Sequence, residues 1–201
     1  MKILISVCTN RGLHPEVARG LVAFDLNSQQ EHHDLKLHFP QGPYISLSRN
    51  NSMREALRWG ADWLFFWDDD TQIKDTNFFN TMKDTAYKYD ATIVGLPYRL
   101  GTPDEIIYNV ADKVNGEYTH YRELPSEPKE VDALGTGAML INIAWIRKNW
   151  PEPPYFQVIN NKIDAISEDY FFCEGVKERG GKVILEPRIK TTHWKLVGLT
   201  F

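Results

Sequence analysis

The sequence of 201 residues lacks several features that would assign it to a specialised class of protein. It has two cysteines, Cys8 and Cys173, so we expect no disulfide framework and a reducing, cytoplasmic location. It has no leader-like start and no apolar run near the roughly 18 residues of a membrane-spanning helix, so no membrane span is expected. Its net charge of −4 provides no basic field, so general nucleic-acid binding is not expected either. An anionic ligand would therefore need a cation or a local basic patch.

Several short catalytic motifs are also missing. There is no GxSxG, HExxH or CxxC, which removes the usual signatures of α/β-hydrolases, zinc peptidases and thioredoxin-like proteins. The "LGTGAML" stretch has two glycines around Thr136, but it lacks the spacing of a dinucleotide or P-loop motif. No internal repeat or low-complexity segment interrupts the chain.

The first hundred residues alternate between strand-like and helix-like patterns. Short apolar runs such as "ILISVCTN" and "DWLFFW" are typical of buried parallel strands, and amphipathic stretches separate them. In the helix predicted around residues 46–62, Ser48 is the expected cap and Gly60 the expected stop. The alternation predicts an α/β fold with a mostly parallel central sheet and helices on both faces.

The second half begins with a different pattern. Asn115-Gly116 lies between two strand-like runs, which predicts a β-hairpin. A strand and a short helix follow in "VDALGTGAMLINIAWIRKN", and a helix capped by Ser167 ends at Gly180-Gly181. No linker separates these segments from the first half, so we expect one domain over residues 1–201.

Three consecutive aspartates, Asp68, Asp69 and Asp70, come directly after the apolar run "WLFFW". In open α/β sheets, ligands bind beyond the carboxyl ends of the strands, where these residues would lie. Residues i and i+2 of an extended segment share a side, so Asp68 and Asp70 can converge on a divalent cation. The alternative is an acidic, solvated turn, but the aromatic run before it places the aspartates at the edge of the core.

Two other places carry candidate chemistry. Glu168 and Asp169 fall in the first turn of a helix, where the helix dipole alone explains acidic residues, although Asp169 can also serve as a general base. His193 in "KTTHWK" is either a structural histidine or a nitrogen ligand for a divalent ion.

The order of these elements resembles the GT-A family of nucleotide-sugar glycosyltransferases, over roughly residues 2–195. The resemblance implies a single GT-A, Rossmann-like domain, with a nucleotide-binding half at about 1–100 and an acceptor-binding half at about 101–201. The three aspartates are similar to the DxD motif of that family, which implies a metal site at Asp68, Asp70 and His193 that holds Mn²⁺ or Mg²⁺. By the same resemblance, Glu168 and Asp169 would be catalytic, at the acceptor hydroxyl. The donor-binding residues that it implies are Thr9, Asn10, Arg11, Arg49, Asn50, Asp68, Asp69, Asp70, Gly137 and Lys195.

The expected reaction is transfer of a sugar from a nucleoside-diphosphate sugar, with UDP favoured over GDP, to a hydroxyl of a glycan or glycoconjugate. Inversion and retention at the anomeric carbon both stay open. The chain is short for this family, so we expect a bare catalytic core, which is either one module of a longer protein or a compact virus-encoded or bacterial enzyme. A nucleotidyltransferase is the alternative enzyme, but "TNRGLHPE" has one glycine and no lysine where such enzymes carry a glycine- and lysine-rich loop. A binding module for nucleotides or sugars without activity is the alternative outside enzymes.

Overall fold

The fold was analysed in a computed structural model, which describes residues 1–9, 12–100, 105–160 and 165–194. Both cysteines are buried and unpaired. None of the helices in these ranges has the length and apolar character that crossing a membrane requires. The helices are α1 (Pro15–Gln30), α2 (Ile45–Trp59), α3 (Phe78–Tyr89), α4 (Ile143–Asn149) and α5 (Glu168–Glu178).

A seven-stranded sheet forms the centre of the molecule, in the order β10-β15-β5-β12-β3-β1-β2. Five of its strands run in one direction, whereas β12 is antiparallel to both its neighbours and β10 is antiparallel to β15. The predicted α/β class with a mostly parallel sheet is therefore confirmed. Its strands are β1 (Lys2–Ser6), β2 (Asp34–His38), β3 (Trp63–Trp67), β5 (Ile93–Gly95), β10 (Lys129–Glu130), β12 (Ala138–Asn142) and β15 (Val183–Leu185).

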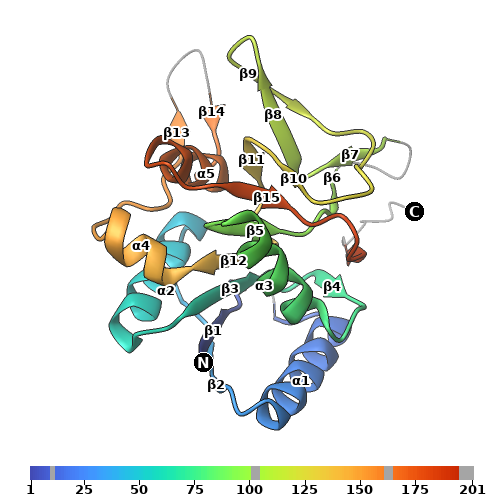
Figure 1. Ribbon diagram of the computed structural model, residues 1–201, viewed down its shortest axis with the longest axis vertical. Coiled ribbons are helices and arrows are strands. Elements are labelled where there is room, and N and C mark those ends of the chain that lie inside the picture. The colour runs from blue at the N-terminus through green and yellow to red at the C-terminus, as the bar shows by residue number, and fades with distance from the viewer. Residues whose placement is uncertain (10–11, 101–104, 161–164, 195–201) are drawn as a thin grey trace, which may run out of the picture.

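Side chains of the central strands point alternately into two hydrophobic cores, one on each face of the sheet. In β3, Phe65 and Trp67 pack with α1 and α3, whereas Leu64 and Phe66 pack with α2, α4 and α5. Figure 1 shows α2 and α4 to the left of the central strands, and α1 and α3 to the right. Every side chain of β3 is buried, so this strand runs through the middle of the core and its carboxyl end is fixed in place.

Smaller sheets extend the second half of the chain. As predicted, Asn115 and Gly116 form the hairpin turn between β8 and β9, and both have positive φ angles of 55° and 90°. Another small sheet pairs β16 with β4, close to the end of β3. The remaining strands are β4 (Thr71–Ile73), β6 (Arg99–Leu100), β7 (Ile107–Tyr108), β8 (Val110–Val114), β9 (Glu117–His120), β11 (Ala133–Leu134), β13 (Ile159–Asn160), β14 (Ala165–Ile166) and β16 (Thr191–His193).

The sequence predicted the end of α2 correctly but not its beginning. Gly60 ends the helix in the left-handed conformation with φ 73°, as expected. The prediction that Ser48 caps the helix was wrong, because α2 begins one turn earlier with Tyr44 in the cap position. Ser48 lies inside the helix, where its carbonyl accepts a hydrogen bond of 3.0 Å from the Ser52 hydroxyl. The extra turn presents Arg49 and Asn50 from within a regular helix.

Candidate active site

The three aspartates form a tight turn between β3 and β4. The Asp68 N–H donates to the Gly137 carbonyl at 2.9 Å, and the Thr71 N–H donates to the Asp68 carbonyl at 3.2 Å. The first of these bonds continues the pairing of β3 with β12, in which Trp67 lies opposite Ala138. The acidic turn is therefore held by the central sheet at the edge where several strands end, as the apolar run before it predicted.

Arg49 on α2 links this turn to the second acidic segment. Its Nη2 lies 3.5 Å from Asp68 Oδ2, and its Nη1 forms an ion pair with Glu168 Oε1 at the start of α5. The arginine is 5% exposed. Burial disfavours its charge, but the carboxylates of Asp68, Asp169 and Glu168 outweigh that cost and raise the pKa of Arg49. One buried cation thus holds together carboxylates from two predicted motifs.

The surroundings of Asp68 neutralise its negative charge only in part. Burial raises its pKa to about 6, and the Arg49 charge only partly opposes this, with Asp70 and Asp69 adding to the rise. Its Oδ1 atom is buried and has no hydrogen-bond partner among the described residues. A buried carboxylate oxygen without a partner is costly, so this position fits a bound cation or donor group.

Asp70 and His193 come together although they are far apart in the sequence. His193 lies in β16, whose pairing with β4 places it opposite Thr71. Its Nδ1 lies 2.9 Å from the Arg99 carbonyl oxygen, which can only accept, so Nδ1 carries a proton. Its Nε2 points at Asp70 Oδ2 at 3.2 Å. A ligating histidine is oriented in the same way by a carbonyl at its other nitrogen.

The predicted three-residue metal site is assembled only in part. Asp70 and His193 meet, whereas Asp68 faces Arg49, and no group of three His, Cys, Asp or Glu converges within the ranges that the structure describes. Mg²⁺-type ions are commonly held by one or two carboxylates together with substrate phosphates. The Asp70–His193 pair and the unpartnered Asp68 Oδ1 fit such a shared site. The ligand roles of these residues stay predictions.

A cavity of about 380 Å³ is lined by Arg49 and by the second acidic segment, whereas none of the three aspartates is among its lining residues. Glu168 is already paired with Arg49, whereas Asp169 accepts hydrogen bonds through Oδ1 from the Ser167 hydroxyl and the Tyr170 N–H. These bonds orient the Asp169 carboxylate at the first turn of α5. The lining includes both carboxylates together with Arg49, Tyr98, Asn109, Tyr118, His120 and Tyr170.

Tyr98 is a functional candidate that the sequence reasoning missed. A Cβ atom at Gly137 would lie 2.7 Å from a ring carbon of Tyr98, so the glycine makes room for the tyrosine. The Gly137 N–H also donates to the Tyr98 hydroxyl at 3.4 Å. A glycine in a strand indicates that another group packs closely against the backbone there. The sequence alone does not identify that group as Tyr98. The predicted donor contact of Gly137 stays a prediction.

Asn50, predicted for donor binding, forms four hydrogen bonds within the chain. Its amide nitrogen donates to the carbonyls of Ser46 and Phe156, at 2.8 and 2.7 Å. Its amide oxygen accepts from the N–H groups of Tyr155 and Phe156, at 2.9 and 3.3 Å. These bonds occupy both ends of a side chain that is 8% exposed. Asn50 therefore fixes the proline-rich segment to α2, and its predicted donor contact stays a prediction.

The loop after β1 and the strand β16 both attach to the acidic turn. His14 donates its N–H to the Asp69 carbonyl at 2.9 Å, and Trp194 donates its N–H to the Asp70 carbonyl at 2.8 Å. The rings of His14 and Trp194 stack with centroids 4.5 Å apart. In the same loop Thr9 accepts from the Gly12 N–H at 2.9 Å. Asn10, Arg11 and Lys195, predicted for donor binding, lie outside the described residues.

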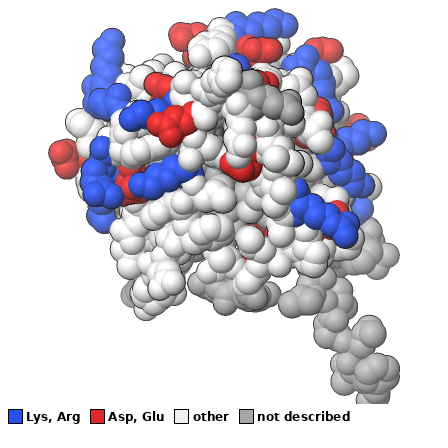
Figure 2. Space-filling model, turned by 90° about the horizontal axis from the view of Figure 1, so that it is seen from below, with Lys and Arg blue, Asp and Glu red and all other residues white. Residues whose placement is uncertain are grey.

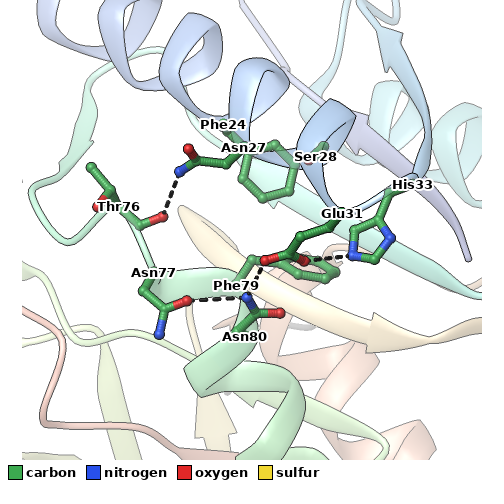
Figure 3. Close-up of a pocket in the computed structure, with 9 residues that line it drawn as sticks. All are labelled: Phe24, Asn27, Ser28, Glu31, His33, Thr76, Asn77, Phe79 and Asn80. Atoms are coloured by element: carbon green, nitrogen blue, oxygen red, sulfur yellow. Dashed lines mark hydrogen bonds and ion pairs between the residues drawn. The ribbon is translucent and has the colours of Figure 1, made fainter.

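A second cavity, of about 230 Å³, lies between α1 and α3 (Figure 3). Glu31 accepts from the Asn80 amide at 2.8 Å and pairs with His33 at 2.8 Å, so polar groups of this cavity bond to one another. None of the predicted site residues lines it.

Comparison with known proteins supports the fold. No protein-family model matches the sequence, and no curated protein matches it. Among solved structures, A197 from STIV matches with a TM-score of 0.68 and 17% identity, over 97% of this chain and 86% of that chain. A UDP-glucose pyrophosphorylase complexed with UDP-glucose matches with a TM-score of 0.54 and 8% identity, over 94% and 91% of the two chains. A UDP-glucose pyrophosphorylase from Acinetobacter baumanii matches with a TM-score of 0.51 and 12% identity, over 94% and 70%. At these identities the likeness establishes a shared fold.

Proposed function

We propose that this chain is a metal-dependent glycosyltransferase of the GT-A type, which moves a sugar from a nucleoside-diphosphate sugar to an acceptor hydroxyl. One observation carries the proposal: the acidic turn and the Glu168–Asp169 pair, predicted from separate motifs, are joined through Arg49 beside one cavity. Such an arrangement suits a reaction between a donor held on one side and an acceptor held on the other. The shared fold with UDP-glucose pyrophosphorylases supports a nucleotide-sugar substrate, and UDP is the favoured nucleotide.

On the donor side, Asp70 and His193 would hold Mn²⁺ or Mg²⁺, with Asp68 next to them. A cation bound there would offset the negative charge of the diphosphate as the leaving group departs. The protein's own part is to keep these groups in place: the Arg99 carbonyl orients His193, and Arg49 holds Asp68. With a net charge of −4, the protein has no general basic field to attract a polyanion, and a bound cation would supply positive charge locally.

On the acceptor side, Asp169 is the candidate base. Its carboxylate would accept the proton of the acceptor hydroxyl as that oxygen bonds to the anomeric carbon and the bond to the diphosphate breaks. Glu168 is engaged by Arg49, so its role is to hold α5 against the acidic turn. This displacement inverts the anomeric carbon. If Asp169 only orients the acceptor, a retaining route stays open as well, and NMR of the product anomer decides between them.

The alternative activity is nucleotidyl transfer, which the two pyrophosphorylase structures favour through their fold. Such an enzyme binds a phosphorylated second substrate. Binding that phosphate requires a Lys or Arg whose charge no carboxylate already neutralises. Among the described residues that line the cavity, Arg49 is the only Lys or Arg, and two carboxylates already pair with it. Tyrosines and His120 make up much of the remaining lining, which suits a neutral sugar.

The test is to incubate the protein with UDP-sugars and Mn²⁺ and to measure release of UDP, first in water and then with glycan acceptors. The proposal predicts UDP release that requires Mn²⁺ and falls in the Asp70→Ala variant. Formation of UTP from UDP-glucose and pyrophosphate, without UDP release, would establish nucleotidyl transfer instead. A protein that binds UDP-sugars but forms no product under any of these conditions would be a binding module.

A further inference from the structure

The main chain of Tyr98, just after β5, is fixed in place by Asn109. The Tyr98 N–H donates to Asn109 Oδ1 at 2.7 Å, and the Asn109 N–H donates to the Tyr98 carbonyl at 3.1 Å. The Asn109 amide nitrogen also donates to the Leu96 carbonyl at 3.2 Å, and this asparagine is 2% exposed. A buried side chain therefore holds the backbone of Tyr98, so the position of its ring is set by packing.

Two glycines make room for the ring and the hydroxyl of Tyr98. A Cβ atom at Gly135 would lie 2.3 Å from the Tyr98 hydroxyl oxygen, and one at Gly137 would lie 2.7 Å from a ring carbon. Both distances are too short for a real contact, so a side chain at either position would displace the tyrosine. The two glycines of "LGTGAML" thus stand where this one side chain approaches the backbone.

The Tyr98 hydroxyl keeps a proton that it can donate. Its oxygen accepts from the Gly137 N–H at 3.4 Å, but no described residue accepts the proton of the hydroxyl itself. Burial raises the pKa of Tyr98, and the charges of Asp68 and Asp169 raise it further, so the hydroxyl stays protonated. Thr71 Oγ1, 3.1 Å from the same Cβ position at Gly137, is buried and also has no partner among the described residues. Two hydroxyl groups beside one glycine therefore lack partners that a polar ligand would supply.

Tyr98 contacts both sides of the proposed reaction. Its ring meets the imidazole of His193 edge to face, with centroids 5.1 Å apart. It also lines the cavity of about 380 Å³ together with Asp169. During glycosyl transfer, the sugar lies between the diphosphate that leaves and the acceptor hydroxyl that attacks. A side chain that neighbours both the proposed metal side and the proposed base therefore lies beside the sugar.

The charges around the Tyr98 hydroxyl favour a neutral sugar over a phosphate. The nearby cation is Arg49, and its charge is already shared between Asp68 and Glu168. Figure 2 views the molecule from the end where Figure 1 places α1, and on that face the Lys and Arg side chains are spread around the rim and form no single basic patch. The phosphates are thus left to the proposed cation, and the hydroxyl is left to an oxygen of the sugar.

We propose that the Tyr98 hydroxyl donates a hydrogen bond to a hydroxyl oxygen of the sugar that is transferred, and thereby selects among nucleotide sugars. This role rests on the proposed glycosyl transfer and names a residue that recognises its donor sugar. A donor without an oxygen at that position leaves the tyrosine hydroxyl without an acceptor. Sites built around such a hydrogen bond reject analogues that lack the matching group.

Tyr98→Phe tests this role, because it removes the hydroxyl and keeps the ring that packs against Gly137 and His193. Titration calorimetry with Mn²⁺ and without acceptor measures the dissociation constants of UDP and of UDP-glucose or UDP-galactose, whichever the wild type binds more tightly. We expect the constant for the UDP-sugar to rise about three- to tenfold, the usual worth of one hydrogen bond. The constant for UDP should stay unchanged, since UDP carries no sugar.

Tyr121→Phe is the matched control. Its hydroxyl donates to Asp112 at 2.6 Å, and Tyr121 is not among the residues that line the cavity. This variant also loses one hydrogen-bonded tyrosine hydroxyl, so it should bind UDP and the UDP-sugar as the wild type does. Circular dichroism establishes that both variants are folded.

Analogues of the same UDP-sugar that lack one hydroxyl at a time provide a second test, which needs no change to the folded wild type. Removing the hydroxyl that Tyr98 contacts should weaken binding to the wild type about three- to tenfold. The same analogue should bind Tyr98→Phe as tightly as the complete UDP-sugar does, because that variant already lacks the hydrogen bond.

The outcomes separate this role from the proposed function. If the wild type does not bind UDP with Mn²⁺, the proposed function fails and the role of Tyr98 fails with it. If UDP binds but a folded Tyr98→Phe variant binds the UDP-sugar as tightly as the wild type, the role of Tyr98 is overturned while the proposed function stands. An equal loss of affinity for UDP and for the UDP-sugar would also overturn it, because Tyr98 would then act on the nucleotide side.

Discussion

The Nε2 atom of His193 lies 3.2 Å from Oδ2 of Asp70, although 123 residues separate them in the sequence. The pairing of β16 with β4 creates this contact, and the Arg99 carbonyl fixes the orientation of the imidazole. Two chain segments therefore contribute to one side of the proposed donor site.

Replacing His193 should weaken metal-dependent nucleotide binding. We expect His193→Ala to reduce the affinity for UDP in the presence of Mn²⁺ at least about tenfold. Mutating even the hydrogen-bond partner of a metal ligand typically lowers metal affinity by about 10–100-fold. His32→Asn is the control, because His32 is exposed with φ 55°, a conformation that asparagine tolerates. Titration calorimetry measures both. Equal affinities in the two variants would remove His193 from the site.

Removing Arg49 should destabilise the fold as well as the site. In Arg49→Met the half-buried carboxylates of Asp68 and Glu168 lose their shared, buried partner, and the free energy of unfolding should fall by about 3–5 kcal/mol. Arg54→Met, on the exposed side of the same helix, should change it by less than about 0.5 kcal/mol. Urea denaturation distinguishes them. If both variants lose a similar free energy of unfolding, the ion pairs of Arg49 with Asp68 and Glu168 do not stabilise the fold.

The raised pKa of Asp68 makes stability depend on pH. Its pKa is about 6 in the folded chain and 3.8 without perturbation, so its contribution to stability is present below about pH 4 and is lost as pH rises through 6. Asp68→Asn removes this dependence. The free energy of unfolding of the variant, relative to wild type, should therefore rise by about 1–2 kcal/mol between pH 4 and pH 7.5. If the difference in free energy of unfolding between the variant and the wild type stays constant with pH, the pKa of Asp68 is not raised in the folded chain.

Asp169 should matter for turnover and not for donor binding. Asp169→Asn should lower the rate of glycosyl transfer by about 10²–10⁴-fold, the usual contribution of a general base, with unchanged affinity for UDP. Glu178→Gln, at the exposed end of the same helix, should leave both unchanged. Initial rates at saturating donor measure the effect. A near-normal rate in Asp169→Asn would rule out its role as base.

Local sequence patterns predicted the parts of the fold that depend on neighbouring residues. The apolar run of residues 63–67 predicted a buried strand with the aspartates at its end, and Asn115-Gly116 predicted a hairpin. Each pattern reflects a requirement within a few residues: alternating burial in a strand, or positive φ angles in a tight turn.

The contacts that the sequence did not predict join residues from different segments of the chain. Asn50 bonds to Tyr155 and Phe156 from another segment, so its type alone could not distinguish a donor contact from a structural one. The ring of Tyr98 fills the space at Gly137 through the packing of two segments. Asp68 Oδ2 faces Arg49 Nη2 at 3.5 Å, a contact between the acidic turn and α2 that the spacing of the aspartates does not indicate.

The most direct test of the account is calorimetric titration of UDP into the wild type and into Asp70→Ala, each with and without Mn²⁺. We expect binding of UDP to the wild type that requires Mn²⁺ and is lost in Asp70→Ala, with circular dichroism showing that the variant is folded. Binding of UDP that is independent of Mn²⁺ and unchanged in Asp70→Ala would contradict it.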